Sequence, residues 1–185
     1  MPALAKSWSP DEVRALQAED STWRRYELID GELIMTNSPS VRHQTMVLEL
    51  TFLIRGYLGM HGLGSVLNSP ADIALDAYSI VQPDIFVTPA ALAVKKWTDV
   101  TSLLLAVEVL SPSTARYDRV VKRRFFQSHG VPEYWVVDID ARVVERWRPI
   151  DDRPDIASES LQWQPDARIV PLTIDLVALF AAASR

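Results

Sequence analysis

The chain has 185 residues, of which 48% are hydrophobic and 23% charged, a composition typical of a soluble globular protein with one substantial core. Its 19 lysines and arginines are outnumbered by 24 aspartates and glutamates, and the net charge of −5 argues against nonspecific nucleic-acid binding by the whole surface. The absence of cysteine excludes disulfides, thiolate zinc sites and thiol nucleophiles.

No targeting or membrane-spanning segment is recognisable. The first residues lack the apolar segment of a secretion signal, and no run approaches the roughly 20 apolar residues that a membrane span needs. We therefore expect a cytoplasmic protein with no membrane partner. We also expect a single domain over residues 1–185, with an N-terminal helix in 1–20, a core in 21–150 and C-terminal strands and a helix in 151–185.

The first elements have clear start and turn signals. Ser9 is a candidate N-cap with a proline next and Glu12 three residues on, which predicts a helix to about Ala18. Asp30-Gly31 lies between the apolar runs 26–29 and 32–35, and this dipeptide favours the tight turn of a β-hairpin.

A longer helix and a series of short strands are predicted next. Apolar residues recur at three- and four-residue steps over 43–57, which indicates an amphipathic helix that ends near Gly59. Segments 65–68, 71–75 and 80–87 are separated by turn residues and are predicted as strands. We expect 88–102 to be a loop with at most one helical turn.

The second half of the chain mixes strands and helices. The run 103–110 is apolar enough for a strand buried on both faces, and Ser113 or Thr114 can cap a helix to about Ser128. Further predicted elements are strands at 133–139 and 143–147, a weak strand or two within 161–172, and a short helix at 175–182. This order favours an α/β fold with a mixed sheet over a regular alternation of strands and helices.

Two carboxylates occupy apolar segments where folding alone would not place them. Glu108 lies within the buried run, where an ionised carboxylate costs several kcal/mol unless something positive compensates it. Asp84 follows Pro83 on another predicted strand. If the two strands are neighbours, both carboxylates reach one spot, and Mg²⁺ commonly uses one or two carboxylates together with water and phosphate.

Lys122 is the basic residue best placed to join them. Steps of 100° along the helix put Tyr117, Val121 and Phe125 on the apolar face and Asp118 and Lys122 at its edge. Lys122 can thus lean back towards the sheet with its ammonium near the carboxylates. The same wheel points Arg116, Arg119 and Arg123 away from the sheet, where they could follow a phosphate backbone.

Several motifs together resemble the Uma-type restriction endonuclease family, which belongs to the PD-(D/E)XK nuclease superfamily. They cover roughly residues 23–147, and the most specific is Glu-Val-Leu-Ser-Pro-Ser-Thr at 108–114. The others are 26–32, 40–43, 82–84, 118–122 and 130–135. The resemblance implies a restriction endonuclease-like fold, a mixed β-sheet flanked by helices with the N-terminal hairpin added to it.

The resemblance also implies the roles of individual residues. Asp84 and Glu108 would be the metal ligands, with the Val109 carbonyl as a further ligand. Two residues after Glu108 stands Leu110 where the superfamily usually has lysine, and the family is thought to take its lysine from the following helix, which fits Lys122. The remaining implied members are Glu32, as an extra acidic group, and His43, near the substrate.

The sequence thus predicts a Mg²⁺- or Mn²⁺-dependent endonuclease that hydrolyses phosphodiester bonds in DNA. One alternative is a catalytically inactive nucleic-acid-binding or accessory protein of the same fold, for which the acidic net charge leaves room. Another is a structural protein in which Glu108 and Lys122 form only an internal ion pair. Six tryptophans, including Trp135 and Trp147, supply enough large apolar surface that we also expect a homodimer.

Overall fold

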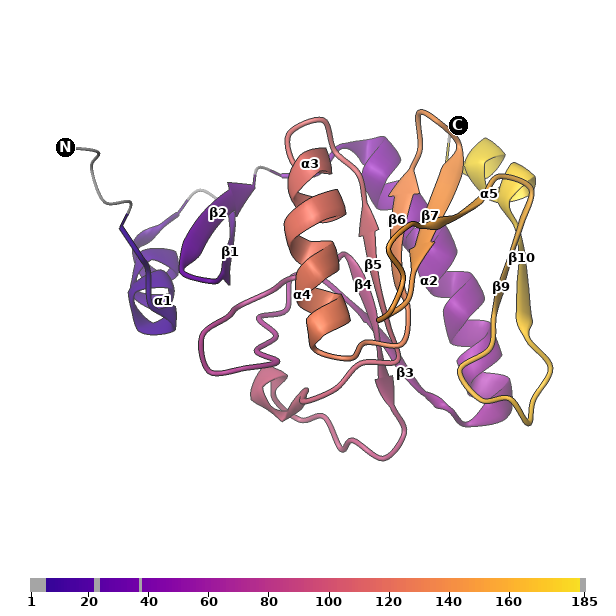
Figure 1. The fold of residues 1–185 in the computed structure, drawn as a ribbon, viewed down its shortest axis with the longest axis horizontal. Helices are drawn as coiled ribbons and strands as arrows, with labels where there is room; N and C mark the ends of the chain where they lie inside the picture. The colour runs from indigo at the N-terminus through magenta and orange to yellow at the C-terminus, as the bar shows by residue number, and fades with distance from the viewer. Residues whose placement is uncertain (1–5, 22–23, 37, 184–185) are drawn as a thin grey trace.

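The computed structural model describes residues 6–21, 24–36 and 38–183, and its centre is a six-stranded mixed sheet with helices on both faces (Figure 1). The strands lie in the sheet in the same order as in the chain. They are β3 (Gly64–Asn68), β4 (Ile85–Pro89), β5 (Leu105–Val109), β6 (Tyr134–Asp138), β7 (Val143–Trp147) and β8 (Asp155–Ala157). β5 and β6 are parallel, and the other neighbouring pairs are antiparallel.

The helices divide between the two faces of this sheet, and two short hairpins lie beside it. Figure 1 shows α2 behind the strands and the helix labelled α3 and α4 in front of them. The helical elements are α1 (Pro10–Glu19), α2 (Val41–His61), η1 (Trp97–Asp99), α3 (Ala115–Tyr117), η2 (Asp118–Lys122), α4 (Arg123–Ser128) and α5 (Leu176–Ala182). The hairpins pair β1 (Arg25–Ile29) with β2 (Glu32–Thr36), and β9 (Ser160–Trp163) with β10 (Leu172–Asp175).

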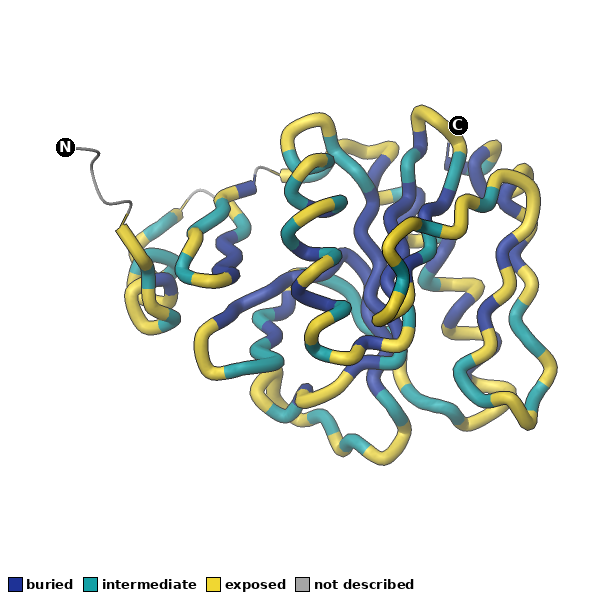
Figure 2. Tube along the Cα trace, viewed as in Figure 1, coloured by how far each residue is buried: buried dark blue, intermediate teal, exposed yellow. Residues whose placement is uncertain are grey.

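The core follows the alternation of side chains along the strands. Val107 and Trp135 belong to the cluster that packs against α2 and α5, whereas Ala106 and Val136 belong to the cluster under Phe126 of α4. Figure 2 shows these central strands as the most continuously buried part of the chain. The expected mixed sheet flanked by helices is confirmed.

The N-terminal elements form as their turn signals predict. The Ser9 hydroxyl accepts from the Glu12 N–H, and the Glu12 carboxylate accepts from the Ser9 N–H, which completes a capping box on α1. In the turn between β1 and β2, Asp30 has φ 51° and Gly31 has φ 78°. The hairpin attaches to the rest of the chain through two backbone hydrogen bonds between Leu28 and Ile80, of 2.7 and 2.8 Å.

Helix α2 is longer than predicted. The Ser40 hydroxyl caps its start by accepting from the His43 N–H at 3.2 Å. The helix continues for two residues past Gly59, where the His61 ring contacts the Tyr57 ring, and it ends where Gly62 takes φ 64°. Gly62 ends the helix and Gly59 does not, because only Gly62 adopts the left-handed conformation.

Two strand predictions were wrong in part. Residues 71–75 form no strand and contribute one isolated bridge, Ile73 to Val81. The strand predicted at 80–87 begins only at Ile85, because Pro83 has no N–H to offer to a sheet ladder. Asp84 therefore lies just before β4, at the end of the sheet where β5 finishes.

The helix after β5 contains a π turn, which was not predicted because a regular rotation of 100° per residue was assumed. The Arg123 N–H donates to the Asp118 carbonyl, five residues earlier, so η2 separates α3 from α4 with one wider turn. This turn keeps Asp118 and Lys122 buried, while it changes the direction of the arginines around them.

The division into residues 1–20, 21–150 and 151–185 within a single domain stays a prediction. The C-terminal elements match their expected positions, since β9, β10 and α5 lie within or beside 161–172 and 175–182. Within the part of the chain that the structure describes, no helix is both long and apolar enough to cross a membrane.

Candidate active site

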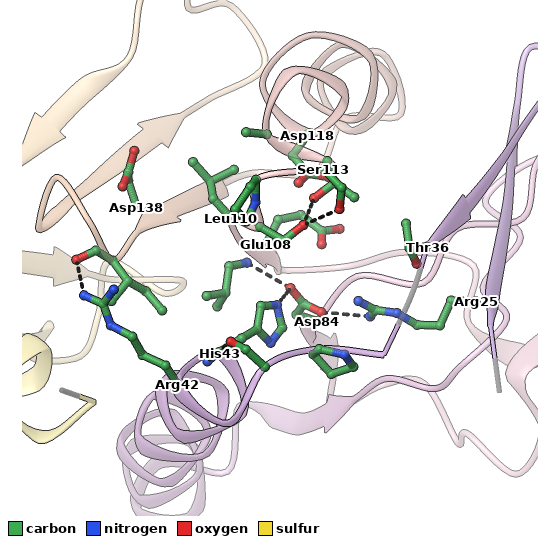
Figure 3. A pocket seen from close by; sticks show the side chains of 18 of the residues that line it. Arg25, Thr36, Arg42, His43, Asp84, Glu108, Leu110, Ser113, Asp118 and Asp138 are labelled. Atoms are coloured by element: carbon green, nitrogen blue, oxygen red, sulfur yellow. Dashed lines mark hydrogen bonds and ion pairs between the residues drawn. The ribbon is translucent and has the colours of Figure 1, made fainter. Parts of the chain in front are cut away.

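A cleft of about 600 Å³ opens at the end of the sheet where β4 begins and β5 and β6 finish. Its walls come from the hairpin β1–β2, the first turn of α2, and the segment from Leu110 through η2. Figure 3 shows the labelled side chains of Arg25, His43, Asp84 and Glu108 gathered in this cleft from these separate elements. Because β4 and β5 are antiparallel neighbours, Asp84 before one strand and Glu108 within the other come together, as predicted.

Both carboxylate oxygens of Asp84 have partners within the protein. Oδ1 accepts from Arg25 Nη1 at 2.8 Å, while Oδ2 lies 3.0 Å from His43 Nε2 and accepts from the Val109 N–H at 2.9 Å (Figure 3). Burial alone would raise the pKa of Asp84, but its hydrogen bonds and charge interactions with His43 and Arg25 hold that pKa well below its ordinary value. Asp84 is therefore an ionised carboxylate at neutral pH.

Lys122 is surrounded by three carboxylates. Its Nζ lies 2.7 Å from Glu108 Oε1, 2.8 Å from Glu27 Oε1 and 3.8 Å from Asp118 Oδ1. Lys122 and Glu108 are each only 3% exposed, so these charges interact with little screening by water. The predicted approach of Lys122 to Glu108 is confirmed.

The pKa shifts in this group follow from burial and mutual charge. Burial raises the pKa of Glu108 well above its ordinary value, because the nearby ammonium offsets only part of the desolvation and other carboxylates oppose ionisation. Burial also raises the pKa of Asp118. Burial would lower the pKa of Lys122, but Glu108, Glu27 and Asp118 raise it well above its usual range, so the ammonium keeps its proton.

The cleft has an excess of negative charge. Four buried carboxylates face the permanent cations Arg25 and Lys122, which leaves a formal charge of −2 when every carboxylate is ionised and His43 is neutral. The four carboxylates belong to Glu27, Asp84, Glu108 and Asp118. A divalent cation is the ligand that would balance this charge, and hard oxygen donors suit Mg²⁺ or Mn²⁺.

The side chains of the cleft provide too few ligands for such a cation by themselves, so a backbone carbonyl and water molecules would have to provide the others. Among the residues that the structure describes, no group of three or more histidine or carboxylate side chains is arranged to hold a metal ion. Asp84 and Glu108 provide two carboxylates. The Val109 N–H points to Asp84, and in a strand the carbonyl of a residue points to the same side as its N–H, so the Val109 carbonyl faces Asp84 as well. Mg²⁺ sites built from one or two carboxylates and several waters need no larger set.

The structure brings together five of the six predicted site residues and leaves one apart. Asp84, Glu108, Val109, Lys122 and His43 all line the cleft. Glu32 is exposed at the start of β2 and does not line it, because the turn of the hairpin lies away from the cleft. The prediction that Glu32 completes the pocket is therefore not carried further.

Two residues of the site were missed. Arg25 and Glu27 lie on the same face of β1 and reach the cleft, where they contact Asp84 and Lys122. The available signal was Glu27 itself, which stands among Tyr26, Leu28 and Ile29, all of them buried. A carboxylate in such a run calls for a partner, by the reasoning that singled out Glu108.

The predicted ridge of arginines was wrong. Arg119 turns to the sheet, where Nε lies 2.6 Å from Glu145 Oε1 and Nη2 lies 2.8 Å from Asp138 Oδ2. Arg123 stacks over the Trp147 ring at 4.6 Å from its centroid. The π turn moves these side chains relative to a regular helix, so Arg116 is left as the exposed member of the three.

Comparison with solved structures identifies the class of fold. A protein from Anabaena variabilis ATCC 29413, described as a putative nuclease belonging to DUF820, has the same fold with a TM-score of 0.75. The likeness covers 92% of this chain and 98% of that one at 18% sequence identity. It therefore extends over most of both chains.

Comparison with sequence families is more specific. The model of the Uma2 family, described as "Putative restriction endonuclease", matches residues 10–178. The chain belongs to the Uma2 family, and the resemblance inferred from its motifs is confirmed. Two relatives in Synechocystis sp. (strain ATCC 27184 / PCC 6803 / Kazusa) are similar as well.

These relatives bear the names Uncharacterized protein slr1290 and Uncharacterized protein sll1609. The first is 29% identical over 146 residues, which are 78% of this chain and 75% of the relative. The second is 27% identical over 150 residues, which are 78% of this chain and 83% of the relative. Both matches span most of the chain.

Proposed function

We propose that this protein is a metal-dependent endonuclease that hydrolyses phosphodiester bonds in DNA. The observation that carries the proposal is the cleft in which Asp84 and Glu108, from adjacent strands, lie near a protonated lysine. Membership of a family described as "Putative restriction endonuclease" supports the same reaction class. The fold of a solved structure described as a putative nuclease agrees with it.

The residues have distinct roles in this proposal. Asp84, Glu108 and the Val109 carbonyl would hold Mg²⁺ or Mn²⁺, which when bound supplies Lewis acidity and a water of lowered pKa. Lys122 keeps its proton, so it serves as a hydrogen-bond donor that positions the attacking water and stabilises negative charge on the phosphate, and not as a general base. His43 and Arg25 hold the orientation of the Asp84 carboxylate.

Cleavage of supercoiled plasmid DNA tests the proposal directly. We expect wild-type protein to cut in Mg²⁺ or Mn²⁺ and to stop in EDTA, and Glu108→Gln to reduce the rate by about 100-fold or more. Glu133→Gln is the matched control, because Glu133 is a partly buried glutamate just before β6 that lies outside the cleft and accepts from Trp135 Nε1. Metal-dependent cutting that persists unchanged in Glu108→Gln would falsify the assignment.

An inactive nucleic-acid-binding protein of the same fold is the second candidate. The observation that favours it is that both oxygens of Asp84, and the ammonium of Lys122, already have protein partners. Thermal denaturation separates the two candidates, since a ligand that binds only the native state stabilises it. For a metal site, Mn²⁺ raises the melting temperature of wild type and not of Asp84→Asn. Equal responses of the two proteins support the inactive candidate.

The homodimer stays a prediction, and three of the six tryptophans give it no support. Trp135 and Trp163 are fully buried within the monomer and Trp147 is only 8% exposed, so these rings offer no surface to a second copy. Sedimentation velocity over a range of concentrations measures the oligomeric state. A monomer at all concentrations would remove the dimer from the proposal without affecting the cleft.

A further inference from the structure

A second groove of about 610 Å³ lies next to the catalytic cleft. The two hollows share Arg25, Ser38, Pro39 and Asp84 in their linings. The second one continues from Asp84 between the hairpin and α2 towards the end of β3. A strand of nucleic acid with its scissile phosphate at Asp84 would therefore continue into this groove.

The lining of the groove combines apolar and polar groups in the way that a nucleobase requires. Val47, Leu48 and Pro70 form apolar wall, and Leu48 is 68% exposed although it is a leucine. Arg24 is exposed at the rim, where a cation can contact a phosphate. Pockets for an unpaired base pack it between aromatic or apolar side chains, and cations contact the adjoining backbone.

The groove also contains a buried acceptor without a donor. Gln82 is 5% exposed, and its Oε1 has no hydrogen-bond partner in the protein. Its Nε2 donates to Asp72 Oδ1 at 2.6 Å, which fixes the amide, because the flipped amide would place Oε1 against that carboxylate. A buried oxygen held without a donor from the protein is costly to the fold, and a donor supplied by a ligand would satisfy it.

We propose that this groove binds one unpaired nucleotide next to the scissile phosphate, and that Gln82 Oε1 accepts from an N–H on the Watson–Crick edge of its base. The proposal rests on the proposed nuclease function for the position of the phosphate. It adds that the preferred substrate is single-stranded at this position, since base pairing would occupy the N–H that Gln82 needs. Gln82 is thus assigned as a specificity-determining residue outside the metal site.

Binding of short oligothymidylate, measured by fluorescence anisotropy in EDTA, tests the proposal without any cleavage. Thymine has one Watson–Crick donor, N3–H, and N3-methylthymine lacks it. We expect N3 methylation to weaken binding to wild type by about fivefold or more, the effect of one lost hydrogen bond. In Gln82→Met the loss on N3 methylation should be clearly smaller than in wild type, because the steric effect of the methyl group appears in both proteins and cancels when the two affinity ratios are compared.

A pair of substitutions on α2 tests the wall of the groove. Leu48→Glu places a negative charge within it and is expected to weaken oligothymidylate binding by about fivefold or more. Phe52→Glu is the matched control, one turn further along α2, 74% exposed and outside both hollows, and it should change binding less than about twofold. Both positions are on the surface, so this pair remains informative if Gln82→Met fails to fold.

The outcomes separate this inference from the nuclease proposal. Sensitivity to N3 methylation and to Leu48→Glu, in a protein that cuts no DNA, keeps the nucleotide site and rejects the nuclease. Three results would overturn the nucleotide site whatever the cleavage assay shows. They are no measurable binding of oligothymidylate, equal binding of the two oligonucleotides to wild type, and equal effects of Leu48→Glu and Phe52→Glu.

Discussion

Lys122 is the single residue on which most of the electrostatics of the cleft depends. One ammonium contacts the carboxylates of Glu27 and Glu108 and approaches that of Asp118, all of them buried. Removing one partner of a buried ionic group is costly because the charges left behind cannot be hydrated. Lys122 is therefore required for stability as well as for the proposed chemistry.

Lys122→Met is expected to lower the free energy of unfolding by about 3–5 kcal/mol. The double variant Glu108→Gln/Lys122→Met should recover part of this loss, because it also removes a carboxylate that the ammonium had compensated. Urea denaturation monitored by tryptophan fluorescence measures both values. If the single variant is as stable as wild type, the ion pairs around Lys122 carry no net stabilisation.

For individual residues, rules of strand and helix spacing were enough to predict three members of the site, but they did not predict two others. Asp84, Glu108 and Lys122 could be predicted because strand alternation and helical spacing are local rules that operate within one element. Arg25 and Glu27 could not be placed, because their contacts depend on where the hairpin docks. That docking is a tertiary property with no periodicity in the chain.

Among the elements, the hairpin β1–β2 depends most on its turn. Gly31 has φ 78°, and an added Cβ would lie 2.3 Å from the Ser7 Oγ, whereas Gly56 lies within α2 with open space around it. The Gly31 carbonyl also accepts from the Trp8 N–H at 2.9 Å, so the turn holds the start of the chain in place. Gly31 thus has neither the backbone conformation nor the space for a side chain, whereas Gly56 has both.

Substituting alanine at each glycine is expected to change stability in opposite directions. Gly31→Ala should lower the free energy of unfolding by about 1–2 kcal/mol, because alanine is strained at positive φ. Gly56→Ala should raise it by up to about 1 kcal/mol, because alanine is the better helix former. Thermal denaturation of both variants measures the change in stability. A higher melting temperature for Gly31→Ala as well as for Gly56→Ala would show that the turn tolerates a side chain.

The helix after β5 marks the limit of sequence reasoning about elements. Its bounds and the approach of Lys122 to the carboxylates were predicted, but the π turn at η2 was not, since every position was assigned a 100° step. The extra residue in the turn directs Arg119 to Asp138 and Glu145 while Lys122 stays towards Glu108. A wider turn has no signature in composition, so the arginines were assigned to solvent.

For the whole molecule, the order of elements was enough to predict the class of fold. The continuous apolar run 103–110 indicated a strand covered on both faces, which the packing of β5 between α2 and α4 confirms. The start of β4 was misplaced because the apolar residues before Pro83 are also buried, and burial without ladder hydrogen bonds looks the same in a sequence. The positions of β3 and β8 at the two edges of the sheet could not be predicted, because no local sequence pattern indicates which strands pair.

The balance of charges also sets the pH dependence of folding. The pKa values of Glu108 and Asp118 are raised by burial, so the folded protein holds protons that the unfolded chain releases. Their contribution to stability is complete below the ordinary carboxyl range, about pH 4, and is lost as pH rises through the raised values. The pKa of Asp84 is lowered, so its contribution is present above that range and is lost as pH falls.

We therefore expect the melting temperature in EDTA to fall as the pH is raised from about 5 to 8, and to fall less steeply in Glu108→Gln. The variant lacks the titrating carboxyl and retains an acceptor for Lys122. Saturating Mn²⁺ should reduce the slope in wild type, because it binds the ionised carboxylates. Identical slopes for wild type and Glu108→Gln in EDTA would show that Glu108 does not titrate in this window.

The two charged residues of β1 give the hairpin a thermodynamic role. Arg25 forms an ion pair with Asp84 Oδ1, the oxygen that a metal ion would use in the proposed function. Glu27 forms an ion pair with Lys122 Nζ, the group that a phosphate would contact. The hairpin acts as a tethered competitor whose effective concentration is fixed by the turn and by the bonds between Leu28 and Ile80. If the cleft binds a cation as proposed, its apparent affinity is the intrinsic affinity multiplied by the fraction of molecules in which Arg25 has withdrawn. Anything that shifts the docking of β1 would then adjust that affinity without touching a ligand of the metal.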